Sequence, residues 1–145
     1  GTSMHVKVIL KDKGSAVETI QPDATIADVI DRLKSRRIGV LVVSGNGQSV
    51  DGIIFERDIV NGLAEHGASL LDQRVDALMT ANVRTCTGED TVMSVMELMT
   101  DRRIRHVPVV KEGRLTGIVS IGDAVKNRLH ELENEASQLR EYINT

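Results

Sequence analysis

The first half of the chain alternates between apolar residues at helical spacing and short, continuous apolar runs. Val6, Ile9 and Leu10 follow the helical spacing, which predicts a short N-terminal helix ending at Lys13-Gly14. A continuous run at 39–43 predicts a strand buried on both faces, followed by a hairpin turn at 44–48. The same criteria predict four more elements: a strand at 16–20, a helix that is capped by Thr25 and buries Ile26, Val29, Ile30 and Leu33, a strand at 50–55, and a helix opened by Asp58 that runs through Leu63.

The second half repeats this order of elements after a connection over residues 66–82. Val75, Leu78 and Met79 in the connection favour a short helix there over a flexible linker. The pattern then predicts a strand at 83–87, a helix that buries Val92, Val95, Met96 and Met99, a strand from Arg102 to Val110, a hairpin turn at 111–114 and a strand that leads into Gly117.

An internal repeat becomes visible when the two halves are compared. Residues 25–30 align with 91–96, residues 36–38 with 102–104 and, after one gap, residues 52–58 with 117–123. A unit this small buries little surface by itself. We therefore expect an α+β fold of two βαββα repeats that pack face to face about a pseudo-twofold axis, with clefts between them for ligands.

After Asp123 the chain contains neither Gly nor Pro, which predicts one long helix. Its apolar residues alternate steps of four and three, the spacing of a heptad seam: Val125, Leu129, Leu132, Ala136, Leu139 and Ile143. Such a helix is longer than one small domain needs. It either folds back on its own core or pairs with the same helix of a second chain.

At residues 117–123 a strand turns directly into a helix. This stretch carries a hydroxyl at Ser120, a carboxylate at Asp123 and a small residue, Gly122, that lets a ligand come close. With the amides of a helix N-terminus, these groups suit a phosphate or a ribose. Asp123 is also a good N-cap residue, so capping alone is the competing explanation. The recurrence of the stretch favours binding.

Composition argues against several classes of function. The net charge is −3, no long basic run occurs, and one Phe, one Tyr and no Trp leave little to stack on bases, so we expect no nucleic-acid partner. Cys86 is the single cysteine, which excludes an intrachain disulfide, fits a cytoplasmic protein and favours a buried strand residue. No apolar run reaches membrane-spanning length, no secretory signal is present, and Gly1-Thr2-Ser3 ahead of Met4 are expected to be an expression-tag remnant.

Catalysis has little support in the sequence. No nucleophile elbow, phosphate-binding loop of the Walker type, zinc-protease helix or cysteine cluster occurs. The four histidines are scattered and lack the spacing of metal ligands. We therefore expect neither an enzyme, nor a metal, nor a catalytic cofactor.

The repeated pattern resembles the paired domains named after cystathionine β-synthase, the CBS pair or Bateman module. Two motifs carry the resemblance, Arg-Ile-Arg-His-Val-Pro-Val-Val at 103–110 and Gly-x-x-Ser-x-x-Asp at 117–123, and it extends from Val17 to Asp123. It implies an N-terminal segment at 1–14, CBS repeats at 15–65 and 83–127, a connection at 66–82 and a helical extension at 128–145. CBS pairs commonly associate into flat dimers, so the resemblance also favours a homodimer.

The resemblance implies an adenine-nucleotide site in the second repeat. Arg105 and His106 stand where the family places basic residues that reach a phosphate, and an arginine offers a planar fork that matches phosphate oxygens. Without a ligand, Arg105 would be a solvated charge at a strand end and His106 a core histidine. All the groups together favour binding.

The remaining groups of this implied site surround the ribose and the base. Ser120 is expected to bond a phosphate or ribose oxygen, with the amides of Ile121 and Gly122 nearby. Asp123 is expected to accept hydrogen bonds from the ribose hydroxyls. The adenine is expected in an apolar slot lined by Ile104, Ile118 and, from the first repeat, the backbone of Val17 to Thr19.

The first repeat departs from the family pattern. Asp58 is kept, but Phe55 stands where Ser120 stands, and Gly39-Val40 replace the two basic residues. A second site at Asp58 is therefore either empty or limited to the adenosine end of a ligand. Arg57 either substitutes for the missing charge or pairs with its neighbour Glu56.

The leading hypothesis is a stand-alone sensor that binds AMP, ADP, ATP or NAD(H) and relays its occupancy to a regulated protein that the sequence does not identify. One alternative is an S-adenosylmethionine-binding module, for which the basic residues would be dispensable. Another is a purely structural dimerisation module with empty clefts. Slow nucleotide hydrolysis is the most distant alternative.

Overall fold

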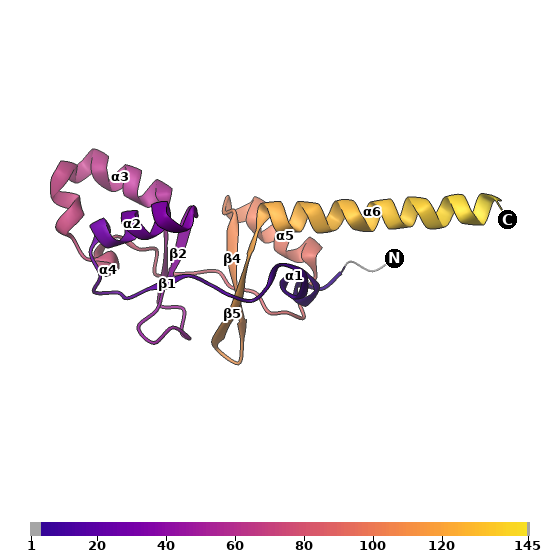
Figure 1. Ribbon diagram of the computed structural model, residues 1–145, viewed down its shortest axis with the longest axis horizontal. Helices are drawn as coiled ribbons and strands as arrows, with labels where there is room; N and C mark the ends of the chain where they lie inside the picture. The colour runs from indigo at the N-terminus through magenta and orange to yellow at the C-terminus, as the bar shows by residue number, and fades with distance from the viewer. Residues whose placement is uncertain (1–3, 145) are drawn as a thin grey trace. The chain divides into compact units, whose positions relative to one another are not determined.

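The computed structural model describes residues 4–144, which form two compact units (Figure 1). The repeat-1 unit comprises residues 16–84 and a hairpin tip, residues 111–116. The repeat-2 unit comprises residues 4–15, 85–110 and 117–144. Helices and strands mix in both, which confirms the α+β class. The expected tag remnant at 1–3 lies outside the described residues.

The repeat-1 unit is built on one sheet in the strand order β1-β2-β3. β1 (Thr19–Ile20) runs parallel to β2 (Val40–Val43), which pairs antiparallel with β3 (Gly52–Phe55). Only the last two residues of the strand predicted at 16–20 form β1, because these two are in register with β2. The helical elements of the unit are α2 (Ile26–Arg36), α3 (Glu56–His66), η1 (Gly67–Asp72) and α4 (Val75–Leu78).

The start of α2 follows from a reciprocal cap. The Thr25 hydroxyl accepts a hydrogen bond from the Asp28 amide at 3.2 Å, and the Asp28 carboxylate accepts one from the Thr25 amide at 3.2 Å. The predicted cap is therefore confirmed. Behind it the apolar face packs into the core of the unit together with Leu41, Ile54 and Leu70, each of which is fully buried. All four residues of β2 are buried, as its continuous apolar run predicts.

The repeat-2 unit contains α1 (Val6–Lys13), α5 (Val92–Arg102), α6 (Ile121–Asn144) and most of β4 (His106–Lys111) and β5 (Arg114–Ser120), whose tip belongs to the repeat-1 unit. The start predicted for β4 at Arg102 is wrong, because α5 continues to Arg102 and the strand begins only at His106. β4 and β5 form a hairpin whose turn residues, Glu112 and Gly113, have φ angles of 52° and 77°. Two successive positive φ angles are the signature of the tight turn that best matches strand twist. The predicted turn at 111–114 is thus confirmed.

The strand predicted at 83–87 is wrong. In this segment only Cys86 pairs with a neighbouring strand, through an isolated parallel bridge to Val109. The Cys86 amide donates to the Pro108 carbonyl at 3.0 Å, and the Val110 amide donates to the Cys86 carbonyl at 2.8 Å. Most of the residues around Cys86 are exposed and polar, so no second residue is held in register.

Packing explains the glycine that opens the last stretch of each repeat. A Cβ atom on Gly52 would collide with the Met79 sulfur, and one on Gly117 would lie 2.6 Å from Leu10 Cδ2. Both distances are shorter than real Cβ contacts allow, and both glycines are buried. The two motif glycines therefore let a neighbouring segment pack directly on the strand.

Both helices that follow the motif begin earlier than predicted. α3 starts at Glu56 rather than Asp58, and α6 starts at Ile121 rather than after an N-cap at Asp123. Each aspartate is the third helical residue and accepts a hydrogen bond from the amide that precedes the helix. The predicted capping role is right in kind, but its position is wrong.

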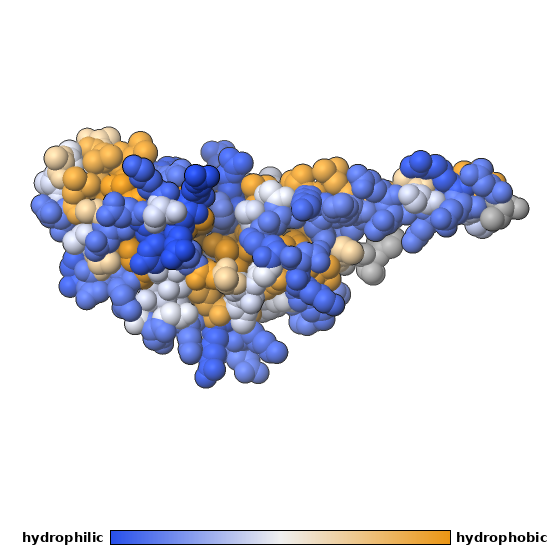
Figure 2. All heavy atoms as spheres, in the orientation of Figure 1, coloured by the Kyte–Doolittle hydropathy of each residue, from blue (hydrophilic) through white to orange (hydrophobic). Residues whose placement is uncertain are grey.

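α6 packs on its own unit through a polar face. Its buried residues are Ala124, Asn127 and Glu131, and Glu131 accepts hydrogen bonds from the Met4 amide at 3.2 Å and the Arg128 guanidinium at 2.9 Å. The heptad seam lies on a different face of the helix and is exposed, and Figure 2 shows apolar surface over α6. Among the described residues, the seam does not fold back on the core.

Cys86 is expected to be chemically inert in the folded chain. It is 4% exposed, and burial, with a smaller contribution from Asp90, raises the pKa of its thiol to about 12. Because only the thiolate attacks disulfide reagents, we expect its reaction with Ellman's reagent at pH 8 to be about a thousandfold slower in the native chain than in guanidinium chloride. Similar rates in the two conditions would contradict the burial of this residue.

Within residues 4–144, no helix combines the length and the apolar character needed to cross a bilayer.

Candidate functional site

The turn from β5 into α6 is closed by a reciprocal pair of hydrogen bonds. The Ser120 amide donates to Asp123 Oδ2 at 2.9 Å, and the Asp123 amide donates to Ser120 Oγ at 3.1 Å. This capping box fixes both side chains at the helix start, where the backbone amides favour negative charge. Ser120 and Asp123 are therefore brought together as the sequence predicts.

Lys13, at the end of α1, reaches this turn. Its Nζ lies 2.7 Å from Asp123 Oδ2 and donates to the Ile118 carbonyl at 3.0 Å. Both contacts to the carboxylate fall on Oδ2, and within residues 4–144 Oδ1 receives no hydrogen bond. Burial by itself raises the pKa of Asp123, but hydrogen bonds from Lys13 and Ser120 outweigh it and hold the pKa below its usual value.

Sequence reasoning missed Lys13. Its position in the last turn of a helix is common for a lysine and indicates only a favourable charge near a helix C-terminus. The carboxylate that it meets lies 110 residues further along the chain. The one available signal was the basic pair Lys11 and Lys13 at the end of a predicted helix, which names no partner.

Arg105 and His106 lie at the start of β4, next to the same turn. The Ile121 amide donates to the Arg105 carbonyl at 2.8 Å, which ties the first residue of α6 to this strand. The Arg105 side chain is exposed and His106 is half-buried. Burial lowers the pKa of His106 below its usual value, and the positive charge of Lys13 adds to this effect while Asp123 opposes it. His106 therefore lies within electrostatic reach of both Lys13 and Asp123.

The other predicted residues of the second repeat surround this turn. Ile104 and Ile121 are half-buried against the core of the unit, and Ile118 supplies the carbonyl that Lys13 binds. Gly122 is exposed, and its amide is the first-turn N–H of α6 that has no acceptor among the described residues. An unpaired helix amide beside an open carboxylate oxygen offers one donor and one acceptor to a polar ligand.

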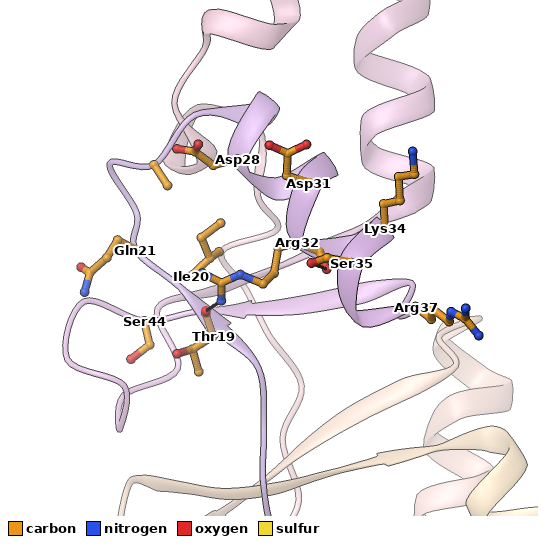
Figure 3. A pocket seen from close by; sticks show the side chains of 11 residues that line it. Thr19, Ile20, Gln21, Asp28, Asp31, Arg32, Lys34, Ser35, Arg37 and Ser44 are labelled. Carbon is orange, nitrogen blue, oxygen red and sulfur yellow. Dashed lines mark hydrogen bonds between the residues drawn. The ribbon is translucent and has the colours of Figure 1, made fainter.

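The two remaining predicted residues, Val17 and Thr19, belong to the repeat-1 unit. The Thr19 carbonyl accepts a hydrogen bond from Arg32 at 3.1 Å, and Thr19 lines a hollow beside α2 (Figure 3). Charged side chains of both signs surround this hollow: Asp28, Asp31, Arg32, Lys34 and Arg37. The hollow therefore lacks a concentration of positive charge, and the role of Val17 and Thr19 in an adenine slot stays a prediction.

The first repeat reproduces the backbone of this turn and its aspartate, but not the hydroxyl or the basic pair. The Phe55 amide donates to Asp58 Oδ2 at 2.9 Å, and the Glu56 amide donates to the Gly39 carbonyl at 3.1 Å, as their counterparts do in the second repeat. Arg57 lies over the Phe55 ring, 5.8 Å from its centroid. In the described structure this ring contact replaces the ion pair with Glu56 that the sequence also allowed.

Metal binding finds no support in the described residues. Within residues 4–144, no group of three or more histidine, cysteine, aspartate or glutamate side chains is placed to hold a metal ion.

Comparison with known proteins accounts for the duplicated backbone. The family model of the CBS domain matches residues 13–65 and again residues 75–130. The chain belongs to the CBS domain family. Both matches include the capping aspartates, so the CBS pair places one such turn in each repeat.

Two of the matching proteins illustrate this similarity. The chain is 36% identical over 149 residues to the mitochondrial CBS domain-containing protein CBSX3 of Arabidopsis thaliana, covering 97% of this chain and 72% of the relative. A crystal structure of a CBS-domain-containing protein from Agrobacterium tumefaciens superposes with a TM-score of 0.83 at 44% identity, covering 88% of this chain and 96% of the other.

A third comparison involves a structure with ligands. The CBS domain pair of protein MJ0100, crystallised with 5′-methylthioadenosine and S-adenosyl-L-methionine, superposes with a TM-score of 0.77 at 26% identity. The match covers 90% of this chain and 99% of that one. CBS pairs are regulatory modules that bind adenosine-containing ligands, and this chain is a pair of that kind.

Proposed function

We propose that this chain is a regulatory sensor that binds an adenine nucleotide (AMP, ADP, ATP or NAD(H)) at the β5–α6 turn of the repeat-2 unit. The proposal rests on the carboxylate of Asp123, of which only one oxygen is hydrogen-bonded in the described structure. Its Oδ2 is held by Lys13 and Ser120 while Oδ1 receives no bond from the described residues. A hydrogen bond to a partly buried acceptor of this kind is favourable, and a ribose hydroxyl can donate it.

Positive charge around this carboxylate favours a phosphorylated ligand over adenosine. Arg105 and Lys13 carry positive charge near His106, and the neutral His106 ring and the Gly122 amide add donors. Each is a donor with no negative charge of its own, and phosphate oxygens accept from several donors at once. The ribose is proposed at Asp123 and Ser120, with the phosphates toward Arg105.

Ligand binding is proposed to act through Lys13. A ribose that hydrogen-bonds Asp123 competes with Lys13 for the carboxylate, and Lys13 is the last residue of α1, which packs against α6. Release of Lys13 would weaken the attachment of α1 to the turn. The ligand shifts the balance between the two states only by the difference in its affinities for them.

Isothermal titration of the full chain tests this proposal, with AMP, ADP, ATP, NAD⁺, NADH and S-adenosylmethionine as ligands. Saturable micromolar binding of a phosphorylated adenosine is expected, and it should raise the melting temperature with ligand concentration. No heat and no thermal shift with any of the six ligands would favour a purely structural module instead.

S-adenosylmethionine is the second candidate ligand, because the CBS pair of MJ0100 was crystallised with it and with 5′-methylthioadenosine. Neither molecule carries a phosphate. For such a ligand, Asp123 remains the partner of the ribose while Arg105 and His106 lose their function. The order of affinities in the titration separates the two candidates.

We also infer that the chain forms a homodimer, which acts on a regulated protein in the cytoplasm without catalysing a reaction. Incubation with ATP followed by a phosphate assay checks the last point, and release of inorganic phosphate at a rate proportional to protein concentration would overturn it.

His106 is expected to change its protonation when a nucleotide binds. Its pKa lies below the usual value of 6.5 in the free chain, so the ring is neutral at pH 7. As the pH falls, His106 is protonated at a higher pH in the unfolded chain than in the folded chain. The free energy of unfolding should therefore fall as the pH drops below 6.5. A bound phosphate favours the charged ring and should raise the pKa.

Titration of the His106 ring protons by NMR, with and without saturating ATP, measures both effects. A His106→Gln variant identifies the resonance and should remove its share of the pH dependence. An unchanged pKa at saturation would place the phosphates away from this residue.

A further inference from the structure

The apolar seam of α6 is exposed in the single chain. Five of its six residues are large apolar side chains, each at least 41% exposed: Val125 41%, Leu129 55%, Leu132 43%, Leu139 60% and Ile143 71%. The face that packs on the repeat-2 unit is instead the polar one, with Asn127 and Glu131 buried. A helix that turns its apolar stripe outward needs another surface to cover it.

We propose that α6 pairs in parallel and in register with α6 of a second copy of this chain, as a short two-stranded coiled coil. The inference deepens the homodimer proposed above and does not depend on which ligand binds. The steps of four and three assign Leu129, Ala136 and Ile143 to heptad position a and place Val125, Leu132 and Leu139 at position d. When the two helices are in register, each seam residue contacts the same residue of the other helix across a twofold axis.

The charged residues that flank the seam select this partner and direction. In a parallel pair, a residue at position g faces position e of the next heptad on the other helix. Arg128 at g then faces Glu133 of the partner subunit, and Glu135 at g faces Arg140 of the partner subunit. Both contacts join opposite charges, and the twofold axis repeats each of them.

The structure leaves these flanking groups accessible. Glu133, Glu135 and Arg140 are exposed. Arg128 is half-buried and bonds Glu131 through Nη1 at 2.9 Å, which leaves the other N–H groups of its guanidinium for a second carboxylate. A second copy of α6 therefore supplies both the apolar stripe and the complementary charges that this face requires.

Disulfide capture tests the direction and the register on the full chain. Leu139→Cys should form an interchain disulfide under mild oxidation, because position d of one helix faces the same residue of the other. Ser137→Cys is the matched control, since it lies two residues away on the outer side of the coiled coil. The native Cys86 is buried and should not contribute.

Four outcomes would overturn the proposal. The first is a monomer at all concentrations, and the second is a dimer in which Leu139→Cys is not captured. The third is capture that requires Leu129→Cys together with Leu139→Cys, because that result indicates antiparallel helices. Equal capture of Ser137→Cys would also overturn it, because that result indicates random collision.

Charge exchange gives an independent measurement by analytical ultracentrifugation at low salt. Glu135→Arg turns two attractive contacts into repulsive ones and should weaken dimerisation about tenfold, and adding Arg140→Glu should restore it. An unchanged dimer in the single variant would contradict the pairing. Titration of these variants with ATP keeps the two proposals apart, since the β5–α6 turn is unchanged and nucleotide affinity should stay the same.

Discussion

Asp123→Ala is expected to weaken adenine-nucleotide binding by about a hundredfold or more. The variant removes the acceptor proposed for the ribose hydroxyls, and hydrogen bonds to a charged group contribute about 1.5–3 kcal/mol each. It also leaves Lys13 without the carboxylate that it contacts at 2.7 Å. Isothermal titration with the tightest-binding nucleotide measures the loss. The helix start should weaken as well, by about 1 kcal/mol, because half of its capping box is gone.

Asp58→Ala is the matched control for this variant. It removes the equivalent hydrogen bond at the start of α3, where the Phe55 amide donates to Asp58 at 2.9 Å. The loss of thermal stability should therefore be similar, but the tight binding event should persist. If both variants lost binding equally, the effect of Asp123→Ala would be one of stability. If neither did, the ribose would not bind at Asp123.

The pairing of these two aspartates shows what the sequence predicts well. Local hydrogen bonding decides a helix start, so an aspartate at each turn marked both α3 and α6. The sequence did not separate an N-cap from the third helical residue, because an aspartate stabilises a helix start in either position. Buried strands such as β2 were predictable for a similar reason, since a continuous apolar run has few other places to go.

Contacts between distant parts of the chain were not predictable. Lys13 and Asp123 are 110 residues apart, and no local pattern joins them. The polar inner face of α6 is a second case, because Glu131 is buried by its bonds to Met4 and Arg128 rather than by apolar packing. A heptad seam by itself suggests that the apolar side of the helix faces the core. Here the bonds of Glu131 hold the polar side against the unit, and the seam is exposed.

The strand expected around Cys86 failed for a related reason. Strand propensity there was adequate, but a strand also needs a partner in register over several residues. In the first repeat β1 finds two such residues, whereas in the second only Cys86 pairs. The two repeats thus share a sequence pattern and differ in a pairing that the pattern does not encode.

Arg105→Ala is expected to reveal the class of ligand. If a phosphate lies against the guanidinium, the variant should weaken ATP and ADP binding about 10- to 100-fold, the effect of losing charge-assisted hydrogen bonds. Binding of 5′-methylthioadenosine should change less than about twofold, because this ligand has no anionic group for the guanidinium to bind. Titrations of both ligand classes on one variant give the ratio directly.

Arg102→Ala serves as the control, since it removes an exposed arginine at the end of α5 and lowers the net charge equally. Long-range attraction of an anion would make the two variants similar and would make both effects disappear at high salt. If Arg105 contacts the phosphate, only Arg105→Ala should weaken nucleotide binding, and the loss of affinity should persist at high salt. Equal losses for phosphorylated and unphosphorylated ligands would mean that the Arg105 side chain does not contact a phosphate, and the choice of ligand would then rest on Lys13 and His106.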